Sequence, residues 1–137
     1  MPLDHFNIAV PQGKLEDIIT FLTTSFEPLG LKEIARPVPT VVGFGEKTPY
    51  FWLNVADLKE VDSKSHEAVL KSQHIAFTAA TTEEVRQVHA AALKAGATCN
   101  GPPGIRAYYH PGYYAAFVVN PVLGINFEVI CHDDASR

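Results

Sequence analysis

Basic clusters and long apolar runs are both missing from this sequence of 137 residues. The net charge is −4, and acidic and basic residues are scattered along the chain, which argues against a nucleic-acid partner. The longest apolar runs are far shorter than the roughly 20 residues that a membrane-spanning helix needs. We therefore expect neither nucleic acid nor a membrane among the partners of this chain.

Cysteine is also scarce, since the chain has only Cys99 and Cys131. These two residues do not have the spacing of a metal-ligand motif, and a disulfide between them is the minor alternative to two reduced thiols. The first ten residues, MPLDHFNIAV, contain neither a positively charged segment nor a signal-peptide cleavage site. Together these absences predict a cytoplasmic protein.

What is present is an alternation of short apolar segments and amphipathic ones. Residues 3–10 indicate a buried strand, and residues 14–26 carry an apolar stripe at helical spacing, which Pro28 and Gly30 end. Three short runs rich in β-branched and aromatic residues follow. They predict a meander of strands at 31–38, 40–46 and 49–55.

The pattern then starts again. A charged, weakly periodic segment at 57–71 is interpreted as a linker or variable loop, with His66 exposed to solvent. Residues 72–79 indicate a second buried strand, and Thr81 opens a capping box for a helix that Gly96 ends. The Pro/Gly-rich stretch 98–112 is predicted to hold a short strand or lid, and further strands are predicted at 113–120 and 125–132.

The order of elements is therefore strand, helix and three strands, and then the same again. This repeat predicts an α+β fold of two tandem βαβββ modules that form a cupped mixed sheet around a central cavity. The modules would span about 1–56 and about 72–132 of a single domain over 1–137. Each sheet would cover one face with its helix and turn the other face toward the cavity.

Two histidines and one carboxylate occupy matching positions in strands that are otherwise apolar. Side chains alternate across a strand, so if the large apolar residues face the helices, His5 and His74 lie on the opposite face. In the last strand the same alternation places Glu128 on that face. An ionised carboxylate buried without a partner costs several kcal/mol, and a cation held jointly with two imidazoles would offset this cost.

Two histidines and one carboxylate leave coordination positions open for water or substrate, as in facial-triad iron sites and in similar manganese or zinc sites. We therefore predict one divalent metal ion (Fe, Mn, Zn or Ni) bound by His5, His74 and Glu128. The alternative is structural: the histidines are hydrogen-bonded core residues, and Glu128 caps a backbone amide.

The segment GIRAYYHPGYY, residues 104–114, is the densest polar-aromatic cluster of the chain. It contains three candidate catalytic residues. His110 could act as an acid or base near neutral pH, Tyr114 could donate to a developing oxyanion, and Arg106 could hold a carboxylate or phosphate. The alternative is that the aromatic residues only pack a loop or form a dimer contact.

The segments LDHFNIAV at 3–10 and HPGYYAAFVVNPVLGINFEVICH at 110–132 resemble the vicinal oxygen chelate superfamily. This group includes glyoxalase I, extradiol dioxygenases, and fosfomycin- and bleomycin-resistance proteins. The resemblance implies βαβββ modules around a metal-containing cavity, with ligands at the positions of His5, His74 and Glu128. It also implies a small-molecule substrate and a homodimer.

The fourth ligand position of glyoxalase I falls at or near Trp52, whose indole cannot bind a metal. This departure predicts a three-ligand site with negligible glyoxalase I activity, and leaves lyase, isomerase and ring-cleaving dioxygenase chemistries open. One alternative function is metal-independent binding of a small molecule, as in bleomycin-resistance proteins. A structural or interaction domain with a degenerate cavity is the other alternative.

Overall fold

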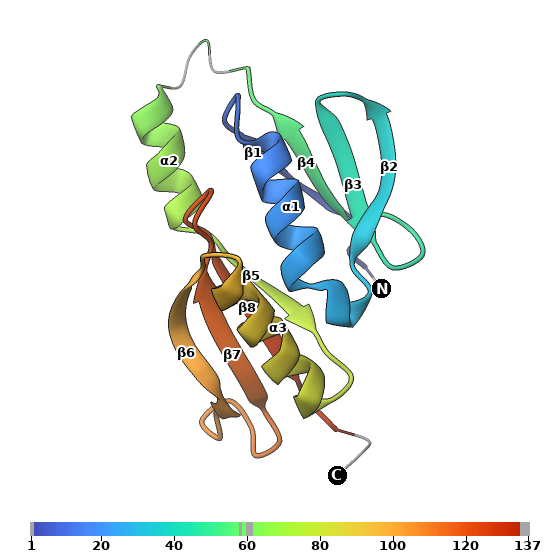
Figure 1. Ribbon diagram of the computed structural model, residues 1–137, viewed down its shortest axis with the longest axis vertical. Helices are drawn as coiled ribbons and strands as arrows, with labels where there is room; N and C mark the ends of the chain where they lie inside the picture. Colours follow the sequence, from blue (N-terminus) through green and yellow to red (C-terminus); the bar gives the residue numbers. More distant parts are fainter. Residues whose placement is uncertain (1, 58, 60–61, 135–137) are drawn as a thin grey trace.

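Two four-stranded sheets with the same topology form the framework of the chain (Figure 1). The computed structural model describes residues 2–57, 59 and 62–134. The first module consists of β1 (Phe6–Val10), α1 (Leu15–Ser25), the short 3-10 helix η1 (Glu27–Leu29), β2 (Lys32–Val38), β3 (Val41–Gly45) and β4 (Phe51–Val55). The second consists of β5 (His74–Thr78), α3 (Thr82–Lys94), β6 (Thr98–Ile105), β7 (Tyr114–Val119) and β8 (Asn126–Cys131).

The strand order is β1-β4-β3-β2 in the first sheet and β5-β8-β7-β6 in the second. In each sheet the first strand of the module runs parallel to the last strand, and the other neighbours are antiparallel. The strands β1 and β5 are thus edge strands, each next to the last strand of its own module. This arrangement confirms the predicted α+β fold of two βαβββ modules.

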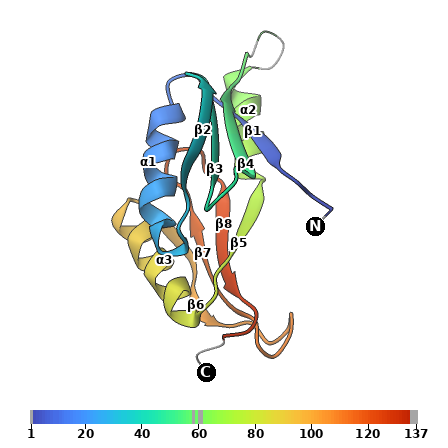
Figure 2. The same ribbon diagram turned by 90° about the vertical axis from the view of Figure 1, so that its right-hand side faces the viewer.

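The helices α1 and α3 lie on the same side of the two sheets, so the opposite sheet faces are also turned to one common side (Figure 2). Each helix buries an apolar stripe against its sheet, as the spacing of the apolar residues predicts. On α1 the stripe includes Ile18 and Leu22, and on α3 it includes Val85 and Val88. Thr81 is the N-cap of α3 and accepts a hydrogen bond from the Glu84 amide at 3.1 Å.

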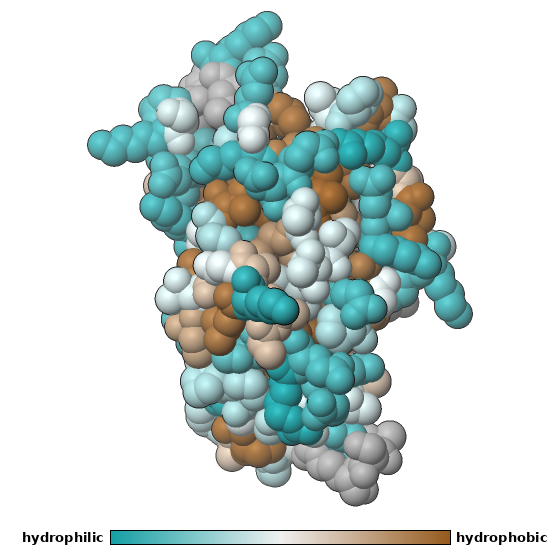
Figure 3. Space-filling view, in the orientation of Figure 1, coloured by the Kyte–Doolittle hydropathy of each residue, from teal (hydrophilic) through white to brown (hydrophobic). Residues whose placement is uncertain are grey.

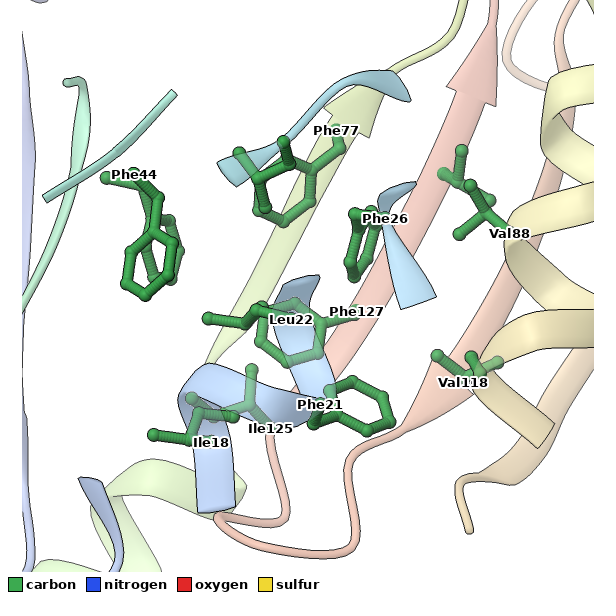
Figure 4. Close-up of a cluster of buried hydrophobic side chains, with 14 of the residues drawn as sticks. Ile18, Phe21, Leu22, Phe26, Phe44, Phe77, Val88, Val118, Ile125 and Phe127 are labelled. Atoms are coloured by element: carbon green, nitrogen blue, oxygen red, sulfur yellow. The ribbon is translucent and has the colours of Figure 1, made fainter. Parts of the chain in front are cut away.

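Phenylalanine side chains from both modules meet in one apolar core (Figure 4). The ring of Phe77 on β5 lies 4.4 Å from that of Phe26, 5.7 Å from that of Phe51 and 6.1 Å from that of Phe127, measured between centroids. Phe26 and Phe51 belong to the first module, whereas Phe77 and Phe127 belong to the second. Phe77 therefore joins the two modules by direct contact.

The segment predicted to be a linker contains a helix, α2 (Ser63–Lys71). Asp62 caps this helix by accepting a hydrogen bond from the Ser65 amide at 2.7 Å. The prediction that His66 is exposed is wrong, because its ring is buried and its Nε2 lies 2.8 Å from the Ala9 carbonyl oxygen. Ala9 is on the edge strand β1, so α2 covers part of that edge.

The face of the molecule seen in Figure 3 is mostly hydrophilic, with small separate apolar patches. In the part of the chain that the structure describes, no helix is both long enough and apolar enough to cross a membrane. The sulfur atoms of Cys99 and Cys131, both described, are not joined in a disulfide.

Candidate functional site

His74 and Glu128 meet on the face of the second sheet that is turned away from α3. The two residues lie on β5 and β8, which pair in parallel, and His74 Nε2 is 2.9 Å from Glu128 Oε1. The Glu128 carboxylate is only 4% exposed, whereas the His74 side chain is 46% exposed. The structure thus brings together two of the three predicted metal ligands, and the pair opens to solvent on the histidine side.

The second ring nitrogen of His74 determines how the pair is protonated. Its Nδ1 lies 3.1 Å from the carbonyl oxygen of Asn126, so a hydrogen bond there requires a proton on Nδ1. A neutral imidazole has only one N–H, which leaves Nε2 with a lone pair that faces the carboxylate. With Nδ1 protonated, a second proton or a metal cation lies between Nε2 and Glu128, whereas in the other neutral tautomer Nε2–H donates to Glu128 Oε1.

Tyr113 provides the partner for the other carboxylate oxygen. Its hydroxyl donates a hydrogen bond to Glu128 Oε2. Burial raises the pKa of the Tyr113 hydroxyl well above its usual range, and the neighbouring Glu128 raises it further. The phenol therefore stays protonated at neutral pH and stabilises the buried carboxylate.

The alternation of side chains on β7 explains why Tyr113, and not the predicted Tyr114, reaches Glu128. Phe117 pairs directly with Glu128 across the sheet, so the residues an even number of positions from Phe117 share its face. Tyr113 is four positions away. Tyr114 faces α3 instead, where its hydroxyl accepts a hydrogen bond from Arg86 Nη1 at 3.2 Å. The structure does not bring Tyr114 to this site.

Phe117 forms an apolar surface beside the pair. The His74 ring stacks on it with centroids 6.0 Å apart, and the Arg106 guanidinium carbon lies 5.5 Å from its centroid. Arg106 donates hydrogen bonds to the carbonyl oxygens of Gly104 and Pro102, at 2.8 and 2.7 Å. A guanidinium has five N–H donors, so Arg106 keeps further donors for an anion at the edge of the site.

His110 lies behind Tyr113, at the end of the second sheet. Its Nε2 is 2.9 Å from His132 Nδ1, and its Nδ1 accepts a hydrogen bond from the Gly112 amide at 3.1 Å. The Tyr113 ring packs edge-on against His110 and His132, with both centroid distances 5.4 Å. His110 therefore neighbours the predicted site through Tyr113. His132 was not among the residues that the sequence singled out.

His5 lies in a separate hollow. Its Nδ1 is 2.5 Å from Asp4 Oδ2, and its side chain is 56% exposed. It lines a cavity of about 590 Å³ between the modules, together with Glu46, Tyr50 and Thr78 among others. Within residues 2–57, 59 and 62–134, no group of three or more His, Cys, Asp or Glu side chains is arranged to hold a metal ion.

Trp52 occupies the open face of the first sheet. A Cβ atom at Gly43 would fall 2.8 Å from the Trp52 ring, so the indole lies over β3 at a position where glycine leaves room for it. Next to it, the side-chain amide of Asn7 donates to the side-chain oxygen of Asn54 at 2.6 Å. This sheet face thus carries an indole and neutral amides at and near the position that the resemblance assigns to the fourth ligand of glyoxalase I.

Comparison with known proteins identifies the fold. No protein-family model matches the chain, and no curated protein matches it in sequence. A glyoxalase/bleomycin resistance protein from Albidiferax ferrireducens T118 has a similar structure, with a TM-score of 0.67 and 20% identity over 93% of this chain and 97% of that one.

Two further solved structures have the same fold. A glyoxalase/bleomycin resistance protein/dioxygenase family enzyme from Burkholderia phytofirmans PsJN matches with a TM-score of 0.69 and 21% identity, over 97% of this chain and 100% of that one. A glyoxalase-related enzyme from Fulvimarina pelagi matches with a TM-score of 0.67 and 14% identity, over 96% and 88%. The chain thus has the glyoxalase/bleomycin resistance/dioxygenase fold, which confirms the resemblance seen in the sequence at the level of the fold.

Proposed function

We propose that this chain is an enzyme that acts on a small oxygenated molecule at the His74–Glu128 pair, with one divalent metal ion as cofactor. The observation that supports this proposal is the 2.9 Å separation of Nε2 and Oε1, with His74 Nδ1 engaged by a backbone carbonyl. An imidazole held in this way is the usual form of a metal-binding histidine. Fe, Mn, Zn or Ni would each accept these two donors.

A bound metal would polarise a substrate oxygen and stabilise the negative charge that develops on it. The residues of the chain have their own roles in this proposal. Tyr113 holds a proton at Glu128 Oε2, and Arg106 binds a carboxylate or phosphate group of the substrate. His110 serves as an acid or base from behind Tyr113. Tyr114 has no role, because its hydroxyl lies with Arg86.

The third ligand in this proposal is His5 from a second copy of the chain, in a homodimer. The side chains of His5 and His74 are 56% and 46% exposed, so a second chain can approach both. His5 lies directly before β1, and His74 is the first residue of β5. Both strands are sheet edges, and an open edge favours pairing with another chain.

Metal analysis of mixed variants tests the site and the second copy together. We expect about one metal ion per chain in the wild type, and strongly reduced metal in H5Q and in E128Q. When H5Q and E128Q are unfolded, mixed and refolded together, a mixed dimer can combine His5 of one chain with His74 and Glu128 of the other. Metal content should then recover in part.

The controls separate the two parts of the proposal. R86Q changes an exposed residue on α3 and should bind metal like the wild type. Full metal occupancy in E128Q would overturn the metal site. Loss of metal in H5Q without recovery in the mixture would instead show that all the ligands come from one chain.

A second candidate function is binding of a small molecule without metal or catalysis. The cavity beside His5 favours it, because apolar side chains such as Phe6, Leu31 and Phe77 line it together with the carboxylates of Asp4 and Glu46. This chemistry suits an organic cation with an apolar body. Calorimetry with metal-free protein and a hydrophobic amine tests this function, and E46Q should weaken binding if the function is correct.

A further inference from the structure

A second cavity lies beside the turn that joins β7 to β8. Its volume is about 330 Å³, which is within the range of about 300–1,000 Å³ that is typical of small-molecule sites. Residues 119–124 form one wall, Glu67 and Lys71 come from α2, and Lys14 and Thr98 come from the residue before α1 and from the start of β6. None of these residues belongs to the proposed metal site.

Asn120 lies at the floor of this cavity, because it is only 1% exposed whereas both lysines are exposed. Its Oδ1 accepts hydrogen bonds from the amides of Val122 and Leu123, at 3.0 and 2.6 Å, which fixes the orientation of the side-chain amide. Within residues 2–57, 59 and 62–134, its Nδ2 is buried without a hydrogen-bond partner. Buried donors are rarely left unpaired in native proteins, so this amide can donate two hydrogen bonds to a ligand.

Lys14 brings a positive charge to the same turn. Its Nζ donates a hydrogen bond to the carbonyl oxygen of Val122 at 3.2 Å, across 108 positions of the sequence. An ammonium group has three N–H donors, so two of them remain for a ligand. The contact with the turn thus keeps the charge of Lys14 at the cavity.

Lys71 adds a second ammonium from the end of α2. Its stem lies against the turn, since a Cβ atom at Gly124 would fall 2.7 Å from Lys71 Cγ, and its Nζ is 2.8 Å from Glu67 Oε1. The hydrogen bond and the charge of Lys71 lower the pKa of Glu67, and the charge of Lys14 lowers it further. An exposed ion pair is weak, so an anion can compete with Glu67 for Lys71.

We propose that this cavity binds a phosphate group, to which Asn120 Nδ2 and the ammonium groups of Lys14 and Lys71 donate hydrogen bonds. Two lysines against one carboxylate leave one excess positive charge, which favours an anion. The free donors outnumber the free acceptors, and a phosphate offers three strong acceptor oxygens. Val119, Leu123 and Pro121 also line the cavity, so the carbon part of a phosphate ester can lie against apolar surface.

Titration of the chelator-treated full chain with inorganic phosphate, followed by nuclear magnetic resonance, tests this proposal. The side-chain amide signals of Asn120 should shift, and they report on this cavity and not on Arg106. K14Q should bind phosphate about tenfold more weakly, because it loses a charged donor. E67Q should bind it more tightly, because the carboxylate that competes for Lys71 is removed.

N120D and K32Q complete the test. N120D retains the oxygen that accepts from the turn but replaces the donor by a carboxylate oxygen, so it should abolish binding. K32Q removes one positive charge from β2, outside the cavity, and should keep the affinity within about twofold. Equal weakening in K14Q and K32Q would overturn the site, and so would unshifted Asn120 side-chain signals in the wild type.

The same titration with glycerol phosphate distinguishes the two sources of the group. Tighter binding of glycerol phosphate than of inorganic phosphate would show that the site takes a phosphate ester, and equal affinities would show that it takes free phosphate. Glycerol alone should not shift the Asn120 signals. Because the protein is free of metal in every arm, the result does not depend on the site of His74 and Glu128.

Discussion

Glu128 accepts a hydrogen bond from Tyr113 on one carboxylate oxygen and faces His74 Nε2 with the other, at 2.9 Å. A carboxylate that is 4% exposed is thus stabilised from both sides by residues of its own module. Burial of this charge is tolerated because both oxygens have partners. The pair can therefore form before a metal or a second chain is present.

Replacing Tyr113 by phenylalanine should destabilise the protein. The Y113F variant keeps the ring that packs on His110 and His132 but removes the donor to Glu128. A hydrogen bond to a charged group contributes about 1.5–3 kcal/mol, and we expect a loss in the free energy of unfolding near the lower end because Tyr113 is only half-buried. Urea unfolding measures this loss. Y108F, at a residue that is 76% exposed, is the matched control and should be neutral.

The fold stabilises the neutral form of two of the five tyrosines. Burial raises the pKa of Tyr50 and of Tyr113 well above the usual range, and Glu46 and Glu128 respectively raise them further. A folded-state pKa above the unfolded value gives stability that is fully present below about pH 10 and is lost as pH rises through the folded pKa.

Absorbance titration at alkaline pH should therefore show a late step, above the ordinary tyrosine range, from Tyr50 and Tyr113. In Y50F and Y113F the corresponding late step should disappear. Each variant should also lose less stability than the wild type between about pH 10 and 12, where the native phenols resist ionisation and the unfolded ones do not. Ionisation of Tyr50 and Tyr113 at the ordinary tyrosine pKa in the folded protein would contradict this prediction.

Much of the fold can be predicted from the sequence, because α1, α3 and most strands carry strong local signals. The stripe over 14–26 and the Thr81 cap lead to α1 and α3 almost as predicted, and the alternation in β5 and β8 places His74 and Glu128 on one face. Such signals lie within a few residues of each other. They need no knowledge of how the modules pack.

The remaining features depend on contacts between distant segments. The helix α2 has a short, mostly polar sequence in which only His66 and Leu70 are buried, so its stability comes from packing and not from a long apolar stripe. The relation of His5 to His74 depends on how two sheets are placed, which alternation within strands does not determine. Tyr113 could have been found, since it is four positions from Phe117 on β7.

His89 on α3 should make the protein sensitive to acid. Its ring is buried, and burial lowers its pKa below the ordinary value, while Nε2 lies 3.2 Å from the Cys99 sulfur. A lowered histidine pKa gives stability that is fully present above the unfolded value of about 6.5 and is lost as pH falls through the folded pKa.

Comparison of H89L with the wild type isolates this effect, because all other titrating groups are shared. As pH falls from about 7.5 to about 5, the unfolding free energy of the wild type should decrease more than that of H89L. Nuclear magnetic resonance should show the His89 ring titrating below the ordinary histidine value of about 6.5. A midpoint at or above that value would refute the prediction.

The contact between His66 and Ala9 provides a test of how α2 is attached to the first module. His66 Nε2 lies 2.8 Å from the Ala9 carbonyl oxygen, which points from the open edge of β1. In the described part of the chain His66 Nδ1 is buried without a hydrogen-bond partner, so Nε2 carries the contact. The H66L variant leaves the carbonyl unpaired and should cost about 1–3 kcal/mol in the free energy of unfolding.

Glutamine provides the matched comparison, because its terminal amide lies near the place of the histidine Nε2 and can donate to the same carbonyl. H66Q should therefore retain more stability than H66L. K64A, at an exposed position of the same helix, should change stability by less than about 0.5 kcal/mol. Amide hydrogen exchange should locate the effect, with protection lost in α2 in H66L but retained in H66Q. Equal stability of H66L and the wild type would mean that α2 is held by Leu70 and its neighbours without this hydrogen bond.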